Sequence, residues 1–217
     1  MLTHQQVQAI AANYSKDTKE VEGFLTLWMF LTTHTDLFGW RSKTKPNLNE
    51  IRGLTELAEK YFTSKFTKVS PSIPQTVPDE MVSVILKKFY KHPQEKLKNI
   101  QIEHQHSMAA ENMVGELLER YIDSVLSKYG WIWCCGALVK HVDFIKQEDN
   151  GYRLLQIKNR DNSENSSSKA IRDKTTIEHW FRTFSRTGRT NWNTFPDKAL
   201  KSHLSENEFI SFVERYV

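Results

Sequence analysis

A stripe of apolar residues at helical spacing, from Ala109 to Tyr129, constrains the fold of this chain more than any other feature of its sequence. The apolar positions recur three and four residues apart, which is the pattern of an amphipathic helix with one face turned to a core. Gly130 follows directly, at the position where a glycine commonly ends a helix. We therefore predict a long helix that ends at Gly130 and packs its apolar face against another layer of structure.

Short extended segments follow this helix. Residues 131–135, 139–145 and 152–157 have the composition of strands. The sequence Glu148-Asp149-Asn150-Gly151 is a strong turn signal, so the last two segments are predicted to pair as a β-hairpin.

The remaining segments are predicted to be mostly helical, which together gives an α/β fold with a central mixed sheet flanked by helices. Three prolines between residues 70 and 79 exclude a regular helix there. Helices are predicted over residues 21–31, 49–62, 79–90 and 176–184, and from the capping-box pair Ser205 and Glu208 onward.

Global properties narrow the function classes. The 217 residues suffice for one sizeable core, and no run of 18 apolar residues would cross a membrane. The N-terminus lacks the pattern of a secretory signal, and the two cysteines, Cys134 and Cys135, are neighbours that give no disulfide framework. No GxxxxGK[ST] loop is present. We expect a cytoplasmic protein with no membrane anchor and no nucleotide cofactor.

Positive charge is concentrated late in the chain. Between Lys169 and Arg189 six basic residues stand against two acidic ones, and this excess of +4 equals the formal net charge of the whole chain. A compact positive stretch suits the neutralisation of phosphates, although an ordinary solvated helix face has the same composition.

The predicted hairpin brings three side chains together in either of two registers. With a two-residue turn at Asn150-Gly151, Asp143 lies opposite Lys158; with a four-residue loop over 148–151, it lies opposite Gln156. Opposed residues share a face and strands alternate with period two, so both registers place Asp143, Gln156 and Lys158 on one face.

A carboxylate, an amide oxygen and an ammonium together suit the hydrolysis of a phosphodiester. Asp143 is the predicted main ligand of Mg²⁺, with the amide of Gln156 and the carbonyl of Ile157 as further oxygen ligands. Lys158 is the predicted catalytic cation. The alternative is an exposed cross-strand ion pair between Asp143 and Lys158, worth only about 0.2–1 kcal/mol.

These residues, in their order, resemble the PD-(D/E)XK nuclease superfamily. The resemblance lies in Val142-Asp143, in Gln156-Ile157-Lys158 and in the helix containing Gly115-Glu116-Leu117-Leu118-Glu119. It implies a restriction-endonuclease-like core over residues 96–217. The helical region over 1–95 has an unknown role, with dimerisation and DNA contact as the two options. The resemblance also carries a supporting glutamate of the metal site over to Glu119. On a helical wheel Glu111 lies nearer the apolar face, and it is kept as a rival.

Three longer runs are similar to the SinI-type family of Type II restriction endonucleases: residues 130–134, 155–168 and 180–192. This resemblance covers about residues 109–197. It implies a homodimer of a restriction-modification system that cuts double-stranded DNA at GGWCC. Gln156 departs from the superfamily pattern, which has an acidic residue there. The change removes one charge, so either the Mg²⁺ affinity is lower or Glu111 or Glu119 makes up the deficit.

The segment after the predicted catalytic strand carries side chains that read base edges. Arg160, Asp161 and Glu164 are the candidate readers of guanine and cytosine, whereas the later basic residues suit phosphates. A plain polar loop, and a buried structural role for Trp192, are the alternatives. The predicted DNA-binding residues are Asn159, Arg160, Asp161, Asn162, Ser163, Glu164, Asn165, Lys169, Arg172, Arg182, Arg186, Arg189 and Trp192.

Two other functions stay open from the sequence. One is a structure- or modification-dependent nuclease of the same fold. The other is a catalytically inactive DNA-binding protein, in which Gln156 marks the loss of metal binding.

Overall fold

The computed structural model describes residues 2–161 and 176–217. Their contacts divide the chain into two compact units. The sheet unit contains residues up to Thr67 together with Glu119–Tyr216, and the second unit, here called the helical hairpin, contains Lys68–Leu118. Each unit is described by itself. The predicted functional division of the chain at residue 95 stays a prediction.

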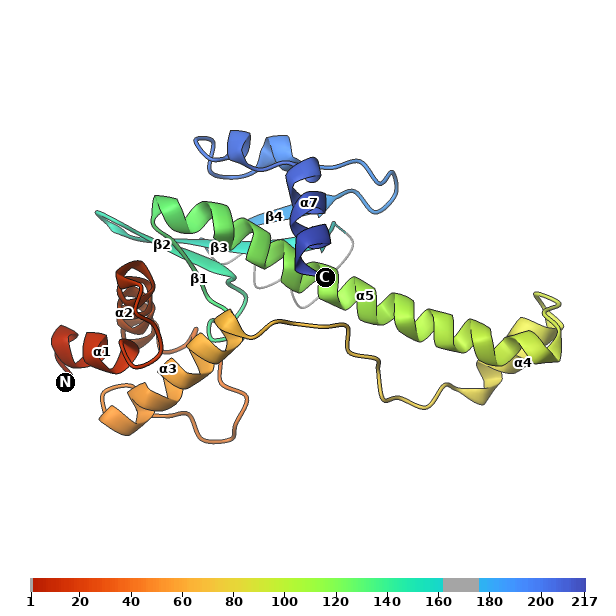
Figure 1. The fold of residues 1–217 in the computed structure, drawn as a ribbon, viewed down its shortest axis with the longest axis horizontal. Coiled ribbons are helices and arrows are strands. Elements are labelled where there is room, and N and C mark those ends of the chain that lie inside the picture. The colour runs from red at the N-terminus through yellow and green to blue at the C-terminus, as the bar shows by residue number, and fades with distance from the viewer. Residues whose placement is uncertain (1, 162–175) are drawn as a thin grey trace. The chain divides into compact units, whose positions relative to one another are not determined.

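The sheet unit is built on a four-stranded mixed sheet with the order β1-β2-β3-β4 (Figure 1). The strands are β1 (Trp131–Trp133), β2 (Phe144–Glu148), β3 (Gly151–Arg160) and β4 (Glu178–Thr183). Neighbouring strands are antiparallel from β1 to β3, and β4 runs parallel to β3. The predicted central mixed sheet is confirmed.

The hairpin of β2 and β3 adopts the second of the two predicted registers. Glu148 pairs with Gly151 and Phe144 pairs with Leu155, so the turn consists of Asp149 and Asn150. The predicted four-residue loop over 148–151 is thus shorter in the structure, because Glu148 and Gly151 pair with each other. Continued by one residue, this register sets Asp143 opposite Gln156.

The prediction of a helix over residues 176–184 is wrong, because Glu178–Thr183 forms β4. Trp180 lies beside Ile157 in the parallel register, and both side chains are buried. The apolar residues of this segment fit a helix as well as a strand over so short a length. Pairing with the exposed edge of β3 decides between them, because the backbone groups of that edge need partners.

Three helices of the sheet unit precede the strands in sequence: α1 (His4–Ala11), α2 (Thr18–Thr33) and α3 (Ile51–Phe66). The rings of Phe24, Tyr61 and Phe62 pack against one another in tilted and edge-on arrangements where α2 meets α3. At the other end of α2, Phe30 packs edge-on against Tyr152 of β3, with ring centroids 5.0 Å apart. The predicted helices over 21–31 and 49–62 are confirmed, and α2 covers the sheet near its hairpin end.

A buried ion cluster ties α2 and α3 to α5 (Gln94–Leu126). The ammonium of Lys65 lies 2.9 Å from Asp123 and 3.3 Å from Glu20, and the Lys65 side chain is only 8% exposed. Charges that are removed from water in this way need partners of opposite sign. The cluster therefore fixes how the C-terminal part of α5 meets the helices before it.

The predicted end of the long helix is confirmed. A short 3-10 turn, η1 (Ser127–Tyr129), follows α5, and Gly130 has the left-handed φ of 82° that ends the helix. The next residue, Trp131, begins β1. Because no Cβ is present at Gly130, the chain can reverse there without strain.

The chain returns to the sheet in two short turns and a final helix. These are η2 (Trp192–Thr194), η3 (Lys201–His203) and α7 (Glu206–Tyr216). The Ser205 hydroxyl accepts a hydrogen bond from the backbone N–H of Glu208 over 3.2 Å. The helix start that was predicted at this pair is confirmed.

The helical hairpin consists of α4 (Glu80–Lys88) and the first part of α5. Residues 69–79, which contain three prolines, form no helix or strand, as predicted. Within the residues that the structure describes, no helix combines the length and the apolarity that a membrane crossing needs.

Candidate active site

Asp143 stands directly before β2, at the point where β2 and β3 cease to pair. Its backbone N–H donates to the Leu155 carbonyl over 2.9 Å, and its carbonyl accepts from Cys134 over 2.8 Å. Its carboxylate Oδ2 accepts a hydrogen bond from the backbone N–H of Ile157 over 2.6 Å. The last paired residues of the two strands are Phe144 and Leu155, so the Ile157 N–H lies beyond the pairing. The Asp143 carboxylate accepts from this N–H, which fixes the carboxylate beside β3.

The half-buried setting of Asp143 changes its acidity. Desolvation raises the pKa of this carboxyl from 3.8 to about 6, while the Ile157 N–H and the Lys158 ammonium pull it back down. A carboxylate that is costly to ionise gains stability from a nearby cation. Burial is therefore the main reason for the raised pKa of Asp143.

Gln156 and Lys158 lie on the same face of β3, two residues apart. Gln156 is half-buried and lies opposite Asp143 in the extended register, whereas Lys158 is exposed. Ile157 between them points into the core, with 5% of its surface exposed. The alternation therefore keeps the amide and the ammonium at the surface while the strand stays anchored.

Glu119 and Glu111 occupy different surroundings. Glu119 lies in the sheet unit, is half-buried, and accepts a hydrogen bond from Trp133 Nε1 over 2.8 Å. Glu111 belongs to the helical hairpin and is exposed. The structure therefore places Glu119, of the two, in the same compact unit as Asp143.

Cys134, directly after β1, is a buried free cysteine. Burial raises the pKa of this thiol well above its usual range, and the charges of Cys135, Asp143 and Glu119 raise it further. A thiol in this setting stays protonated at neutral pH, so it offers neither a nucleophile nor a soft metal ligand.

The donor set fits a hard divalent cation. Among the described residues, no group of three or more His, Cys, Asp or Glu is arranged to hold a metal ion. The oxygen donors that the sequence predicts are the carboxylates of Asp143 and Glu119, the Gln156 amide and the Ile157 carbonyl, all of a kind that Mg²⁺ accepts. Register places Trp133, the partner of Glu119, on the face opposite Gln156. A shared site therefore requires the two to meet at the end of β2, where Asp143 stands.

Comparisons with known proteins identify the family of this chain. A family model described as SinI restriction endonuclease matches residues 5–217. The chain is 48% identical over 180 residues to the Type II restriction enzyme SinI of Salmonella infantis. It is 47% identical over 180 residues to the Type II restriction enzyme Eco47I of Escherichia coli. Each alignment covers 82% of this chain and 78% of the relative.

The chain belongs to the SinI restriction endonuclease family. Its class is therefore that of the Type II restriction enzymes, which are site-specific deoxyribonucleases. The resemblance that the sequence motifs carried over residues 109–197 is confirmed. The family match begins much earlier, at residue 5, where the sequence offers only helices without a chemical motif.

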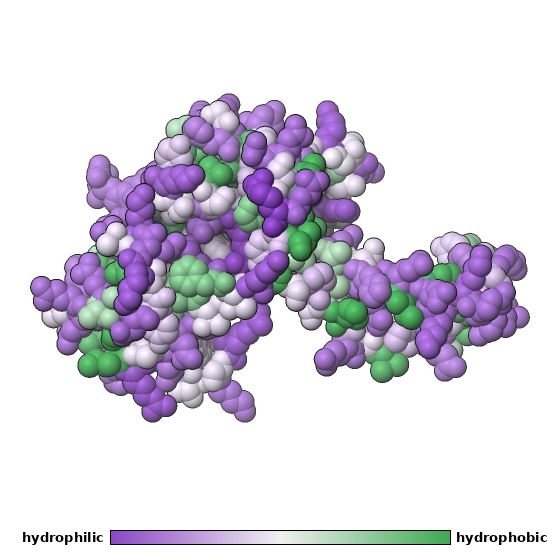
Figure 2. All heavy atoms as spheres, in the orientation of Figure 1, coloured by the Kyte–Doolittle hydropathy of each residue, from purple (hydrophilic) through white to green (hydrophobic). Residues whose placement is uncertain are grey.

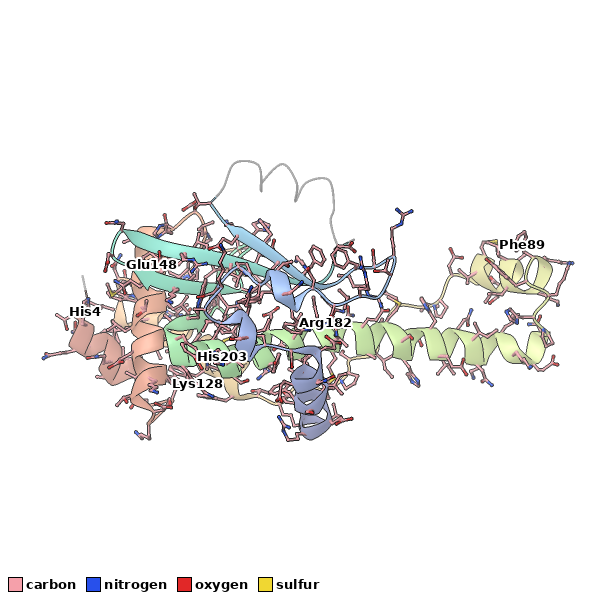
Figure 3. The ribbon with its side chains drawn as sticks, turned by 90° about the horizontal axis from the view of Figure 1, so that it is seen from above. His4, Phe89, Lys128, Glu148, Arg182 and His203 are labelled. Carbon is pink, nitrogen blue, oxygen red and sulfur yellow. The ribbon has the colours of Figure 1, made fainter. Side chains whose placement is uncertain are left out.

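Two of the predicted DNA-contacting residues of this family member hold the protein together. Asn159 accepts from Arg182 Nε through its side chain over 2.9 Å and from the Thr183 hydroxyl through its backbone over 2.9 Å. Arg182 also donates to Glu206 of α7, and its side chain is 15% exposed. These bonds fasten the end of β3 to β4 and to α7, so Arg182 is a structural cation (Figure 3).

Trp192 is a core residue. It is 7% exposed, its Nε1 donates to Glu206 over 2.9 Å, and its ring lies 4.9 Å from that of Trp180. Of the two roles that the sequence left open, the structural one is what the fold shows. Stacking against DNA bases would require this ring to leave the core.

The loop after β4 carries the exposed basic residues. Its ends are closed by hydrogen bonds between Phe184 and Arg189, and Asp161 Oδ1 accepts from the Ser185 backbone over 2.8 Å. Arg186, Arg189 and Arg160 are exposed. The predicted contacts Asn162, Ser163, Glu164, Asn165, Lys169 and Arg172 lie outside the described residues.

Sequence reasoning missed Trp133 and the Ile157 N–H, which hold the two carboxylates. The Trp133 signal was available, since a strand that alternates Trp131-Ile132-Trp133 buries both indoles and their N–H groups then need acceptors. No sequence signal marks the Ile157 N–H, because its role depends on where β2 stops pairing.

Proposed function

We propose that this member of the SinI family is a Mg²⁺-dependent Type II restriction endonuclease with a PD-(D/E)XK core. It hydrolyses phosphodiester bonds of double-stranded DNA at the palindromic site GGWCC and acts as a homodimer. The observation that carries the proposal is the placement of Asp143 at the parting of β2 and β3, opposite Gln156 and within the field of Lys158.

The proposed ligands of the divalent cation are Asp143, Gln156, Glu119 and the Ile157 carbonyl. When bound, the cation stabilises charge on the phosphate and lowers the pKa of the attacking water. Asp143 is held for this task by the Ile157 N–H, which leaves its other oxygen for the cation. Because Gln156 is neutral, Glu119 supplies the second negative charge of the set.

Lys158 acts directly on the reacting groups. Its ammonium is exposed on the face that Gln156 shares, and its charge reaches the Asp143 carboxylate. In the proposed reaction it orients the attacking water and stabilises the negative charge that develops on the phosphate. A compact positive charge is suited to this role, because an ammonium can lie close to the phosphate oxygens on which negative charge develops.

DNA is bound by the exposed basic residues near the end of β3 and after β4. Arg186 and Arg189 neutralise phosphates and fix the position of the duplex, whereas Arg160 reads a guanine edge in the major groove. The polar segment 162–165 supplies the remaining readers. A palindromic site calls for two-fold symmetry, which a homodimer provides.

The test is cleavage of unmethylated plasmid that carries GGWCC sites, with Mg²⁺ or with EDTA. Asp143→Asn is the informative variant, because its amide oxygen can still accept from Ile157 while its charge is lost. Asp149→Asn, in the exposed turn of the same hairpin, is the matched control. Discrete fragments ending at GGWCC with wild type and control, but not with Asp143→Asn or with EDTA, are expected. Cleavage that survives EDTA and Asp143→Asn refutes the proposed centre.

Gln156 favours a second candidate, a DNA-binding protein of the same fold that has lost its activity. This candidate predicts tight, metal-independent binding to DNA with the plasmid left intact. Gln156→Glu separates the two, because a restored carboxylate should create cleavage in an inactive protein. Cleavage of only modified or branched DNA would instead identify a nuclease with different substrate requirements.

A further inference from the structure

The loop that leads from β1 to Asp143 lies at the end of the sheet where the proposed catalytic residues stand. β1 ends at Trp133, which pairs with Phe144, the residue that follows Asp143. The backbone N–H of Cys134 donates to the Asp143 carbonyl over 2.8 Å, which closes the loop 134–142 at its base. A segment that packs on this loop is therefore held beside the catalytic end of β2 and β3.

Residues 36–40 pack on this loop. The N–H of Gly39 donates to the Leu138 carbonyl and the N–H of Lys140 donates to the Leu37 carbonyl, each over 2.8 Å. A Cβ at Gly39 would collide with the backbone of the loop, so a glycine is required for this close approach. The segment before α3 is thus fixed to the segment before Asp143.

The C-terminal half of α3 packs on the same loop. The thiol of Cys135 donates to the Tyr61 carbonyl over 3.4 Å, and both residues are buried. Lys60, the residue before Tyr61, extends its ammonium over the Trp40 ring, 4.4 Å from the centroid. These contacts, all within the sheet unit, hold α3, residues 36–40 and the loop in one arrangement.

Positive charge gathers on this part of the sheet unit. Residues 40–49 contain three basic residues and no carboxylate, and α3 and the loop 134–142 each add a lysine. On the face drawn in Figure 2, hydrophilic residues are frequent where α3 and the loop before it reach the surface. The five cations, here called the Trp40 patch, are Arg41, Lys43, Lys45, Lys60 and Lys140. Lys60 is half-buried and the other four are exposed.

The cations of the Trp40 patch have no carboxylate partner within residues 2–161 and 176–217. The ion pairs of these residues involve other cations. Lys45 and Lys140 donate instead to the backbone carbonyls of Phe38 and Asp36, over 2.9 and 2.8 Å. The positive charge of the patch is therefore available to an anionic partner.

Two of these cations are held close to each other. Burial, and then the Arg41 charge, lower the pKa of the Lys60 ammonium. Arg41 and Lys60 therefore repel each other, while the contact with the Trp40 ring keeps Lys60 in place. An anion bound beside them relieves this repulsion. Duplex DNA presents such anions in regular rows of phosphates.

The strand order sets the patch on one side of the catalytic residues and the loop after β4 on the other. β4 is parallel to β3, so the loop that carries Arg186 and Arg189 leaves the sheet at the same end as the loop 134–142. In the order β1-β2-β3-β4, Asp143 and Gln156 lie between the two loops. A duplex whose phosphodiester reaches Asp143 thus meets cations on both sides.

We propose that the Trp40 patch is a second phosphate-binding surface, which holds the backbone of the same DNA duplex on the β1 side of the catalytic end. This inference rests on the proposed function and extends its DNA contacts. It gives part of the helical region before residue 95 a role in DNA contact. Because phosphates are alike at every base pair, the patch strengthens binding without reading sequence.

The first test is DNA binding by the double variant Arg41→Gln and Lys43→Gln, followed by fluorescence anisotropy with Ca²⁺ in place of Mg²⁺. The double variant Lys19→Gln and Lys128→Gln is the matched control, since it removes the same charge from exposed residues around a hollow at the other end of β1. The first variant should bind duplexes with and without GGWCC more weakly, on the order of tenfold. Its salt slope should fall by about two units, whereas the control should bind as wild type does.

Acetylation of lysines in the full wild-type chain is a second test, which needs no substitution. Bound duplex should slow the modification of Lys43 and Lys140 several-fold, as followed by mass spectrometry. The modification of Lys19 and Lys128 should stay unchanged. Equal modification of Lys43 and Lys140 with and without DNA overturns the proposal and shows that the patch serves another partner.

The outcomes keep this inference apart from the proposed function. Wild-type cleavage at GGWCC, with unchanged binding by the Arg41→Gln and Lys43→Gln variant, overturns the patch and preserves the nuclease. A loss of affinity confined to the duplex with GGWCC also overturns it, because phosphate contacts carry no sequence information. A wild-type protein that neither binds nor cleaves DNA overturns both.

Discussion

The indole Nε1 of Trp133 donates a hydrogen bond to Oε2 of Glu119 over 2.8 Å, and this bond joins β1 to the long helix. Arg120 lies over the same indole ring, 5.0 Å from its centroid. Glu119 is therefore oriented by a rigid, buried donor. Without this bond its carboxylate could turn toward solvent, and the site would lose the charge that Gln156 does not supply.

Trp133→Phe should raise the Mg²⁺ concentration for half-maximal cleavage several-fold, because the ring is kept and only the N–H is removed. Trp131→Phe is the matched control on the same strand, since its Nε1 donates to Asp197 over 3.1 Å, away from the site. Both variants should lose about 1 kcal/mol of stability. Binding of Ca²⁺, followed by calorimetry, checks the effect without turnover. Equal metal dependence in the two variants contradicts a positioning role for Trp133.

Asp143 should make stability depend on pH in the metal-free protein. Its folded pKa of about 6 lies above the usual 3.8, so its protonated form favours folding at low pH. That contribution is fully present below pH 3.8 and is lost as the pH rises through about 6. Asp143→Asn should therefore be more stable than wild type by about 1–3 kcal/mol at pH 8. The difference should vanish near pH 4.

Thermal unfolding at several pH values, with and without Ca²⁺, measures this prediction. The cation should stabilise wild type more than Asp143→Asn, because the ionised carboxylate gains a partner. Cleavage by wild type should fall at low pH, where protons compete with the cation for the Asp143 carboxylate. If Asp143→Asn is less stable than wild type at every pH, the hydrogen bond from the Ile157 N–H to the carboxylate contributes more to stability than desolvation of the carboxylate costs.

Lys158→Met should reduce the cleavage rate by about a hundredfold or more while DNA binding changes little, because the lost charge stabilises the transition state. The Lys158 charge also lowers the pKa of Asp143, so the acid limb of the residual activity should move to higher pH. Lys146→Met is the control, since Lys146 lies on β2 with its ammonium 5.9 Å from the Trp131 ring. An unshifted acid limb argues that Lys158 and Asp143 act separately.

Arginines of the basic region should divide into two groups. Arg186→Ala and Arg189→Ala should weaken DNA binding and each lower the salt dependence by about one unit, with unchanged stability. Arg182→Ala should instead destabilise the fold by about 1–3 kcal/mol, because it leaves the Asn159 side-chain oxygen without its donor and removes one of the two donors to Glu206. Fluorescence anisotropy over a salt series and chemical unfolding measure the two effects. A stable Arg182→Ala protein with a reduced salt slope would reverse this assignment.

Local patterns were sufficient to predict much of the chain. The stripe that ends at Gly130 needs only residues within one helix, and the β2–β3 hairpin needs only two neighbouring segments and a turn. Strand alternation alone put Gln156 and Lys158 on one face of β3. Motifs of the catalytic half also identified the family, since they are contiguous in sequence.

The sequence by itself determined which residue types surround the site, and the tertiary structure decided which of them meet. Two registers of the hairpin were possible from the sequence, and they differ in which residues form the turn. Packing of β2 against β3 selects the register that sets Asp143 opposite Gln156. The segment 178–183 became a strand because the edge of β3 needed hydrogen-bond partners. Burial of Trp192 and of Arg182 depends on α7, which arrives from the end of the chain. These outcomes depend on contacts between residues far apart in the sequence, and a local sequence pattern carries no information about those contacts.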